Sequence, residues 1–71
     1  MNTHIGTILS KNIKELRKKQ GLTQERLAEL TETSYKYIQR IEGKNPPDVR
    51  VTTVVRIAKA LKVKPAELIE F

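Results

Sequence analysis

The stretch from residue 35 to residue 41 combines donor-rich side chains with no acidic group, and that composition suits contact with an anionic partner. Ile38 and Ile41 are three residues apart, as on the buried stripe of a helix. At about 100° per residue, the opposite side of that helix carries polar and cationic side chains. These are Lys36, Gln39 and Arg40, flanked by Tyr35 and Tyr37. The pattern predicts a helix that contacts nucleic acid.

Residues suited to catalysis or metal binding are scarce. The one histidine, His4, is isolated near the start of the chain, and there is no cysteine to bind a metal or form a disulfide. The three glycines form no phosphate-binding loop, and no two carboxylates are spaced to converge on one cavity. We therefore predict no enzymatic activity, no metal, no cofactor and no evident small-molecule site.

A second short helix precedes the donor-rich one. Thr23 is suited to N-cap it, and Leu27, Ala28 and Leu30 are expected to face inward. Ala28 is small enough to let two helices cross closely. Ser34 is suited to N-cap the donor-rich helix that follows. Two short amphipathic helices joined by a turn predict a helix-turn-helix over residues 23–42.

Three further helices are predicted around this unit. Apolar residues at three- and four-residue steps indicate a first helix that ends near Gln20, with Gly21 as its C′ residue. Residues 43–48 contain two prolines and form a loop, after which Thr52 is expected to cap a fourth helix. Its inner residues are predicted to be Val54, Val55, Ile57, Ala58 and Leu61. The β-branched run 49–55 also resembles a strand, but a single strand would have no partner.

Pro65 suits the first position of a last short helix with an apolar face. That face consists of Leu68, Ile69 and Phe71, which either closes the core or pairs two subunits. The 71 residues therefore predict one all-α domain of five helices spanning positions 1–71. A net charge of +6 is typical of nucleic-acid binders. No apolar run is long enough for a membrane span, so we expect a cytoplasmic, nucleoid-associated protein.

Several motifs recur in an order that resembles the phage-repressor-like (Xre/Cro-type) helix-turn-helix family. They are Gly21-Leu22-Thr23-Gln24-Glu25-x-Leu27-Ala28, then Ile38-x-x-Ile41-Glu42-x-Lys44, then Ile57-Ala58-Lys59-Ala60-Leu61. The resemblance covers residues 8–68 and implies a compact lambda-repressor-like domain. Two positions in the turn depart from the family pattern: Glu32 stands where glycine is usual, and Thr31 where an aliphatic residue is usual.

The resemblance also implies residue roles. It places the helix over residues 35–41 in the major groove and assigns phosphate contacts to Gln24, Lys44 and Asn45. It pairs Glu42 with Arg17 as a structural ion pair, for which a guanidinium fork is well suited. It further implies a homodimer on double-stranded DNA.

The remaining candidates follow from side-chain chemistry. Lys36 and Arg40 suit guanine O6 and N7, while the Tyr35 ring suits a thymine methyl or a phosphate. Tyr37 is expected on the helix-helix seam with its hydroxyl near the DNA backbone. Ser34 is first an N-cap and second a phosphate donor, and Gln39 is a secondary candidate.

These expectations combine into a sequence-specific transcriptional regulator, with repression the expected effect. Two alternatives stay open at this stage. One is a protein-interaction module on the same fold, such as an antitoxin or an adaptor. The other is a nonspecific nucleic-acid chaperone, whose affinity would not vary between sequences at fixed salt.

Overall fold

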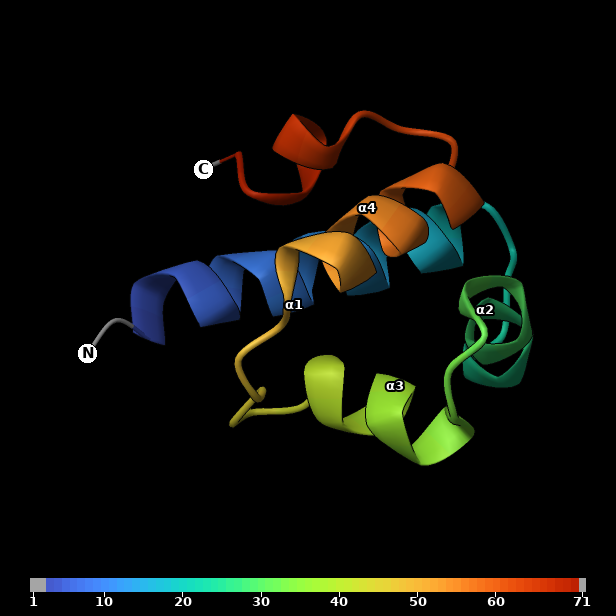
Figure 1. Cartoon of the computed structure of the whole chain (residues 1–71), viewed down its shortest axis with the longest axis horizontal. Coiled ribbons are helices and arrows are strands. Elements are labelled where there is room, and N and C mark those ends of the chain that lie inside the picture. Colours follow the sequence, from blue (N-terminus) through green and yellow to red (C-terminus); the bar gives the residue numbers. More distant parts are fainter. Residues whose placement is uncertain (1–2, 71) are drawn as a thin grey trace.

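The computed structural model describes the backbone of residues 3–70 and the side chains of residues 5–70. Those residues contain four α-helices, one 3-10 turn and no strand. Figure 1 shows α1 (Thr3–Lys19), α2 (Gln24–Thr31), α3 (Tyr35–Ile41), α4 (Val51–Ala60) and η1 (Pro65–Leu68). The all-α prediction is confirmed. The predicted fifth helix is instead a four-residue 3-10 turn, which is too short to build a ladder of α-helical hydrogen bonds.

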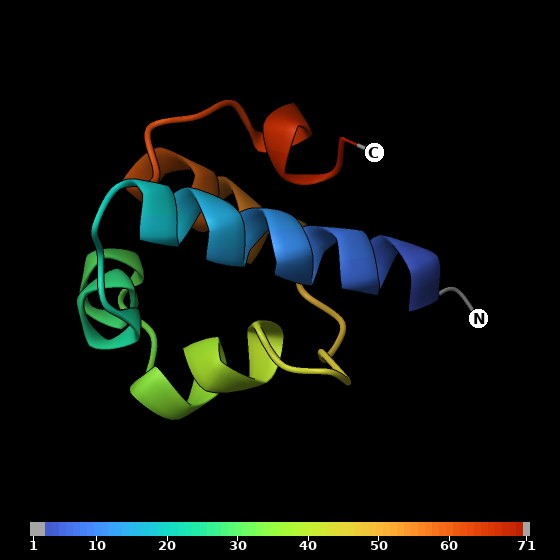
Figure 2. The same cartoon turned by 180° about the vertical axis from the view of Figure 1, so that it is seen from behind.

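The helix pair α2 and α3 lies at one end and the lower side of the molecule in Figure 1. α2 contacts both α3 and α4, whereas η1 contacts α1 and α4. Seen from behind in Figure 2, α1 runs across the molecule between η1 above and α3 below. The C-terminal turn and α3 therefore occupy opposite sides of the domain, which leaves the outer face of α3 uncovered by the described residues.

The core draws apolar side chains from every element. Its buried members are Leu9, Ile13, Leu27, Ala28, Ile38, Ile41, Ile57, Ala58, Leu61 and Leu68. Full burial of one large aliphatic side chain contributes roughly 1.5–3 kcal/mol. α3 is only seven residues long, so its stability depends on this burial more than on helix propensity. The same burial fixes which side of α3 faces outward.

α1 ends close to the predicted position, and Gly21 is its C′ residue as predicted. Gly21 has φ of +72°, a left-handed conformation that costs glycine little. The Gly21 amide donates to the Lys18 carbonyl at 3.0 Å, and the Leu22 amide donates to the Arg17 carbonyl at 3.0 Å. This pair of hydrogen bonds is the Schellman arrangement, which ends α1 and directs the chain into α2.

The helix-turn-helix forms with the two predicted caps. The Thr23 hydroxyl accepts a hydrogen bond from the Arg26 amide at 3.0 Å, and the Ser34 hydroxyl accepts from the Tyr37 amide at 3.0 Å. Between the helices, Glu32 adopts the left-handed conformation, with φ of 58°. The turn therefore keeps the conformation that glycine usually provides, although its residue is a glutamate.

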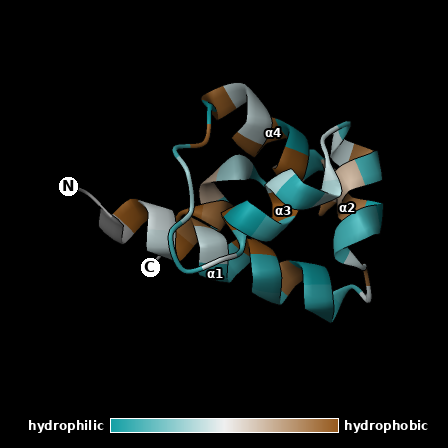
Figure 3. Ribbon diagram, turned by 90° about the horizontal axis from the view of Figure 1, so that it is seen from below, coloured by the Kyte–Doolittle hydropathy of each residue, from teal (hydrophilic) through white to brown (hydrophobic). Residues whose placement is uncertain are grey.

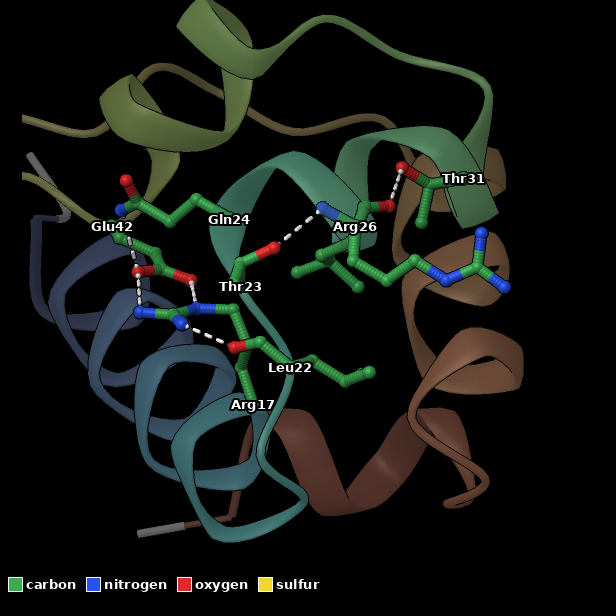
Figure 4. Close-up of polar contacts among 8 residues, drawn as sticks. Arg17, Leu22, Thr23, Gln24, Arg26, Thr31 and Glu42 are labelled. Carbon is green, nitrogen blue, oxygen red and sulfur yellow. Dashed lines mark hydrogen bonds and ion pairs between the residues drawn. The ribbon is translucent and has the colours of Figure 1, made fainter.

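Thr31 occupies the core position that an aliphatic residue would fill. It is only 1% exposed, and its hydroxyl donates to the Leu27 carbonyl at 2.8 Å, as Figure 4 shows. The Thr33 hydroxyl lies 2.9 Å away from the Thr31 hydroxyl. Because the buried hydroxyl has these partners, threonine is accommodated without an unsatisfied polar group.

Two predicted inward residues point outward instead. Leu30 is 42% exposed because the buried stripe of α2 runs through Leu27, Ala28 and Thr31, about 100° away around the helix. Val55 is 45% exposed for the same reason, because the buried stripe of α4 runs through Ile57 and Ala58. The inward assignments of Leu30 and Val55 were therefore wrong.

The start of α4 and the end of the chain also differ from prediction. α4 begins two residues earlier than a Thr52 cap requires, with Arg50 at the N-cap position and no side-chain cap. The last apolar face is divided: Leu68 is fully buried, whereas Ile69 is 44% exposed. Phe71 lies outside the described residues.

Candidate nucleic-acid interface

The outer face of α3 is polar and exposed. Ile38 and Ile41 are fully buried on its inner side, which turns Lys36, Gln39 and Arg40 toward solvent as predicted. Figure 3 views the molecule from the side of α3, where the hydrophilic colour dominates this helix. The face combines two cationic side chains with an amide, and all three can donate hydrogen bonds to a partner from solvent.

The two tyrosines of α3 differ in environment. Tyr35, at the first position of the helix, is 43% exposed, and its hydroxyl accepts a hydrogen bond from the Gln39 amide at 3.1 Å. Tyr37 is half-buried and packs against the core cluster. Tyr35 is thus available to a partner molecule, while the ring of Tyr37 serves mainly to hold α3 in place.

A buried ion pair lies behind the end of α3. The Arg17 guanidinium donates to both oxygens of Glu42, from Nε to Oε2 at 2.7 Å and from the terminal nitrogen NH2 to Oε1 at 3.0 Å. Its other terminal nitrogen, NH1, donates to the Leu22 carbonyl at 2.6 Å (Figure 4). The side chains are 9% and 2% exposed, respectively. This bidentate pair ties α1 to the residue that follows α3.

Gln24 joins the same network. It is half-buried at the first position of α2, and its Nε2 donates to Glu42 Oε1 at 2.9 Å. Figure 4 shows the amide reaching the carboxylate from the side opposite Leu22. This contact was not predicted, because the two residues are eighteen positions apart and no local pattern relates them. One amide N–H is used in the network, which leaves the second for another acceptor.

The loop after α3 extends the cationic surface. Lys44 and Asn45 are both exposed in this loop, which follows the end of α3. The Ser10 hydroxyl donates to the Gly43 carbonyl at 3.3 Å and thereby links the loop to α1. Lys44 and Asn45 are consequently placed beside α3, on a segment that α1 supports.

The described residues offer little for other chemistry. Among residues 5–70, no three histidine, aspartate or glutamate side chains gather as a metal site would require. The His4 side chain lies outside the described side chains. Within residues 3–70, no helix has both the length and the apolar character needed to cross a lipid bilayer. The exposed donors of α2, α3 and the following loop are therefore the strongest candidate site.

Comparison with known protein families now identifies the architecture. A helix-turn-helix family model matches residues 13–68, which include all of α2, α3 and α4. This chain belongs to the Xre/Cro-type helix-turn-helix family. Members of this family are DNA-binding transcriptional regulators, so the exposed donors of α3 belong to a DNA-binding domain.

Solved structures agree with this assignment. The restriction-modification controller C.AhdI from Aeromonas hydrophila is 30% identical, with a TM-score of 0.83 over 89% of this chain and 94% of the controller. The controller C.Esp1396I is also 30% identical, with a TM-score of 0.80 over 90% of this chain and 82% of that one.

The biofilm regulator SinR, solved in complex with DNA, shares the fold at 22% identity. Its TM-score is 0.81 over 87% of this chain and 98% of the SinR chain. A comparison with curated proteins gave no match.

Proposed function

We propose that residues 1–71 form one domain that binds double-stranded DNA at specific sequences and represses transcription by occupying promoter DNA. The observation that carries this proposal is the exposed face of α3, on which Lys36, Gln39 and Arg40 stand clear of the core. Helix α3 is then the element that enters the major groove, as in other helix-turn-helix proteins. We place the protein in the cytoplasm, associated with the nucleoid.

The candidate contacts divide into two groups. Lys36 and Arg40 are one helical turn apart on the outward face, so they are suited to read base edges, with guanine O6 and N7 as acceptors. Tyr35 and Gln39 occupy the neighbouring flank of the same face. Phosphate contacts fall to residues around α3: Gln24, Ser34, Tyr37, Lys44 and Asn45. They set the register of the helix without selecting sequence.

The Arg17–Glu42 pair is assigned a structural role in this proposal. Glu42 accepts from Arg17 and from Gln24, so the carboxylate is engaged on both oxygens and faces the interior. A buried, fully paired carboxylate holds the end of α3 against α1 and the start of α2. It leaves the phosphate-facing surface free of negative charge from this residue.

We include a two-fold homodimer in the proposal. Exposed apolar side chains remain on α4 and after η1, two elements that contact each other: Val51 is 77% exposed, Val55 45% and Ile69 44%. The molecule measures 30 × 23 × 21 Å, a size at which paired subunits can place two α3 helices about 34 Å apart. Selected DNA sites should then be inverted repeats with that spacing.

The dimer is tested by sedimentation velocity on Val55→Lys, which should shift the protein from dimer to monomer. Leu30→Lys is the matched control, because Leu30 is similarly exposed, at 42%, but lies on α2. Recovery of single, unpaired half-sites by the wild-type protein would exclude the two-fold arrangement.

Sequence-specific binding is tested by selecting bound duplexes from a random pool and titrating variants against the selected site. Arg40→Ala and Lys36→Ala should each flatten preference at particular base pairs, by about 1–3 kcal/mol of discrimination. Lys59→Ala is the matched control, since it removes an exposed cation from α4 instead of α3. If both α3 variants keep the full pattern of base preference, α3 is not the reader.

A further inference from the structure

Tyr35 and Gln39 form a hydrogen-bonded pair on the exposed side of α3. Gln39 Nε2 donates to the Tyr35 hydroxyl oxygen at 3.1 Å, and both side chains are exposed. The residues are four positions apart, so their side chains lie one above the other along the helix. An exposed glutamine normally samples several rotamers, and this contact holds the Gln39 side chain in one of them.

The bond determines which groups the glutamine offers to a partner. A carboxamide has two N–H donors and one carbonyl acceptor, and Tyr35 engages one of the donors. The second N–H and Oε1 remain free on the same planar amide. Adenine presents the complementary pair in the major groove, with N7 as acceptor and the N6 amino group as donor.

We infer that Gln39 reads an adenine in the major groove and that Tyr35 is the residue that holds its amide in the reading orientation. This inference rests on the proposed function, because it requires α3 to lie in the groove. Tyr35 acts through Gln39, so it is a positioning residue for this contact. Fixing the amide before binding lowers the ordering cost that a free side chain would incur.

Two side-chain columns on α3 then have different base preferences. Lys36 and Arg40 form the column of pure donors, which suits the two acceptors of guanine. Tyr35 and Gln39 form the adjacent column, which mixes donor and acceptor and suits adenine. The reversed amide, with both N–H groups free, would instead match guanine, so the identity of the selected base distinguishes the two orientations.

The experiment begins with duplexes selected by the wild-type protein. Wild type, Gln39→Ala and Tyr35→Phe are then titrated against the selected site and its three substitutions at each adenine. Tyr37→Phe is the matched control, because it removes a hydroxyl from the other tyrosine of α3, which lies on the opposite flank and packs against the core. Thermal melts verify that each variant is folded.

We expect Gln39→Ala to lose roughly 5- to 150-fold of discrimination at one adenine and none elsewhere. Tyr35→Phe should weaken discrimination at that same adenine while keeping the aromatic ring. Tyr37→Phe removes a proposed phosphate contact, so it should weaken all sequences alike and leave the adenine preference unchanged. The positioning role is overturned if Tyr35→Phe discriminates as wild type does or weakens all sequences equally.

The reading role is overturned if Gln39→Ala keeps every adenine preference, or if the base it affects is guanine. A wild-type protein that selects no sequence at all would refute the proposed function itself. A selective wild type with an unaffected Gln39→Ala variant would refute only the present inference. The two failures are therefore distinguishable in one set of titrations.

Discussion

Truncating Arg17 to alanine should destabilise the domain strongly, because it strands a buried carboxylate. Glu42 is only 2% exposed and receives two of its hydrogen bonds from Arg17. Without the guanidinium, Gln24 is its only remaining partner in the network. Removing one member of a buried ion pair costs about 3–5 kcal/mol, since the other charge stays desolvated.

That loss is a large part of the stability such a domain has. At about 0.05–0.15 kcal/mol per residue, 71 residues have a free energy of unfolding of roughly 4–11 kcal/mol. For a domain of this size, each kcal/mol shifts the Tm by about 4–8 °C. Arg17→Ala should therefore lower the Tm by roughly 12–40 °C, and at the upper end the variant would not fold at ordinary temperature.

The assay is thermal unfolding followed by far-UV circular dichroism, with Arg26→Ala as the matched control. Arg26 pairs with Glu29 at 2.9 Å, but these side chains are 56% and 68% exposed. Breaking that pair should cost no more than about 0.5 kcal/mol. The double variant Arg17→Met, Glu42→Leu should recover much of the loss, because it leaves no unpaired charge.

A melting temperature for Arg17→Ala close to that of Arg26→Ala would refute this reasoning. DNA titrations then distinguish a structural role of Arg17 from a direct contact with DNA. If Arg17→Ala melts normally but binds DNA far more weakly, Arg17 contacts the phosphate backbone directly and its pairing with Glu42 is secondary. If stability and affinity fall together, and the double variant restores the stability, the structural role holds.

The turn and the proposed phosphate contacts give two further tests. Both Glu32 and Gly21 have positive φ, so Glu32→Gly should raise the free energy of unfolding by about 0.5–1 kcal/mol and Gly21→Ala should lower it by about 1 kcal/mol. Thermal melts measure both changes. A destabilising Glu32→Gly or a stabilising Gly21→Ala would contradict this argument from backbone strain. Lys44→Ala should weaken DNA binding to all sequences and reduce the salt dependence of the affinity by about one unit of slope. Gln24→Ala should also weaken binding to all sequences alike. If either variant changes preference at single base positions, that residue is a base reader.

Local signals in the sequence were sufficient for the helical framework. Gly21, Thr23 and Ser34 ended or began helices where predicted, because caps and left-handed stops depend on a few neighbouring residues. Thr52 failed as a cap because two residues of helix, Val51 and Thr52, form before the expected start. No local sequence signal distinguishes a helix that begins at Val51 from one that begins at Thr53.

Side-chain contacts between elements were harder to predict. The bond from Gln24 to Glu42 depends on how α2 packs against the end of α3, and no periodicity encodes that. Thr31 was unexpected in the core, but its hydroxyl bonds within its own helix, which makes the substitution tolerable. The Tyr35–Gln39 pair had a sequence signal, since residues four apart on a helix are neighbours.

The network around Glu42 also explains how an acidic residue is accommodated at the end of the helix that we propose to face DNA. A free carboxylate about 4 Å from a phosphate would cost roughly 1 kcal/mol even in water and more in a partly dry interface. Here the carboxylate is buried and neutralised by Arg17, so the charges that α3 presents are those of Lys36 and Arg40. Because Gln24 shares the same carboxylate, one buried group sets the position of both the start of α2 and the end of α3. In the proposed function, this network holds the element assigned to phosphate contact and the element assigned to base reading in one geometry.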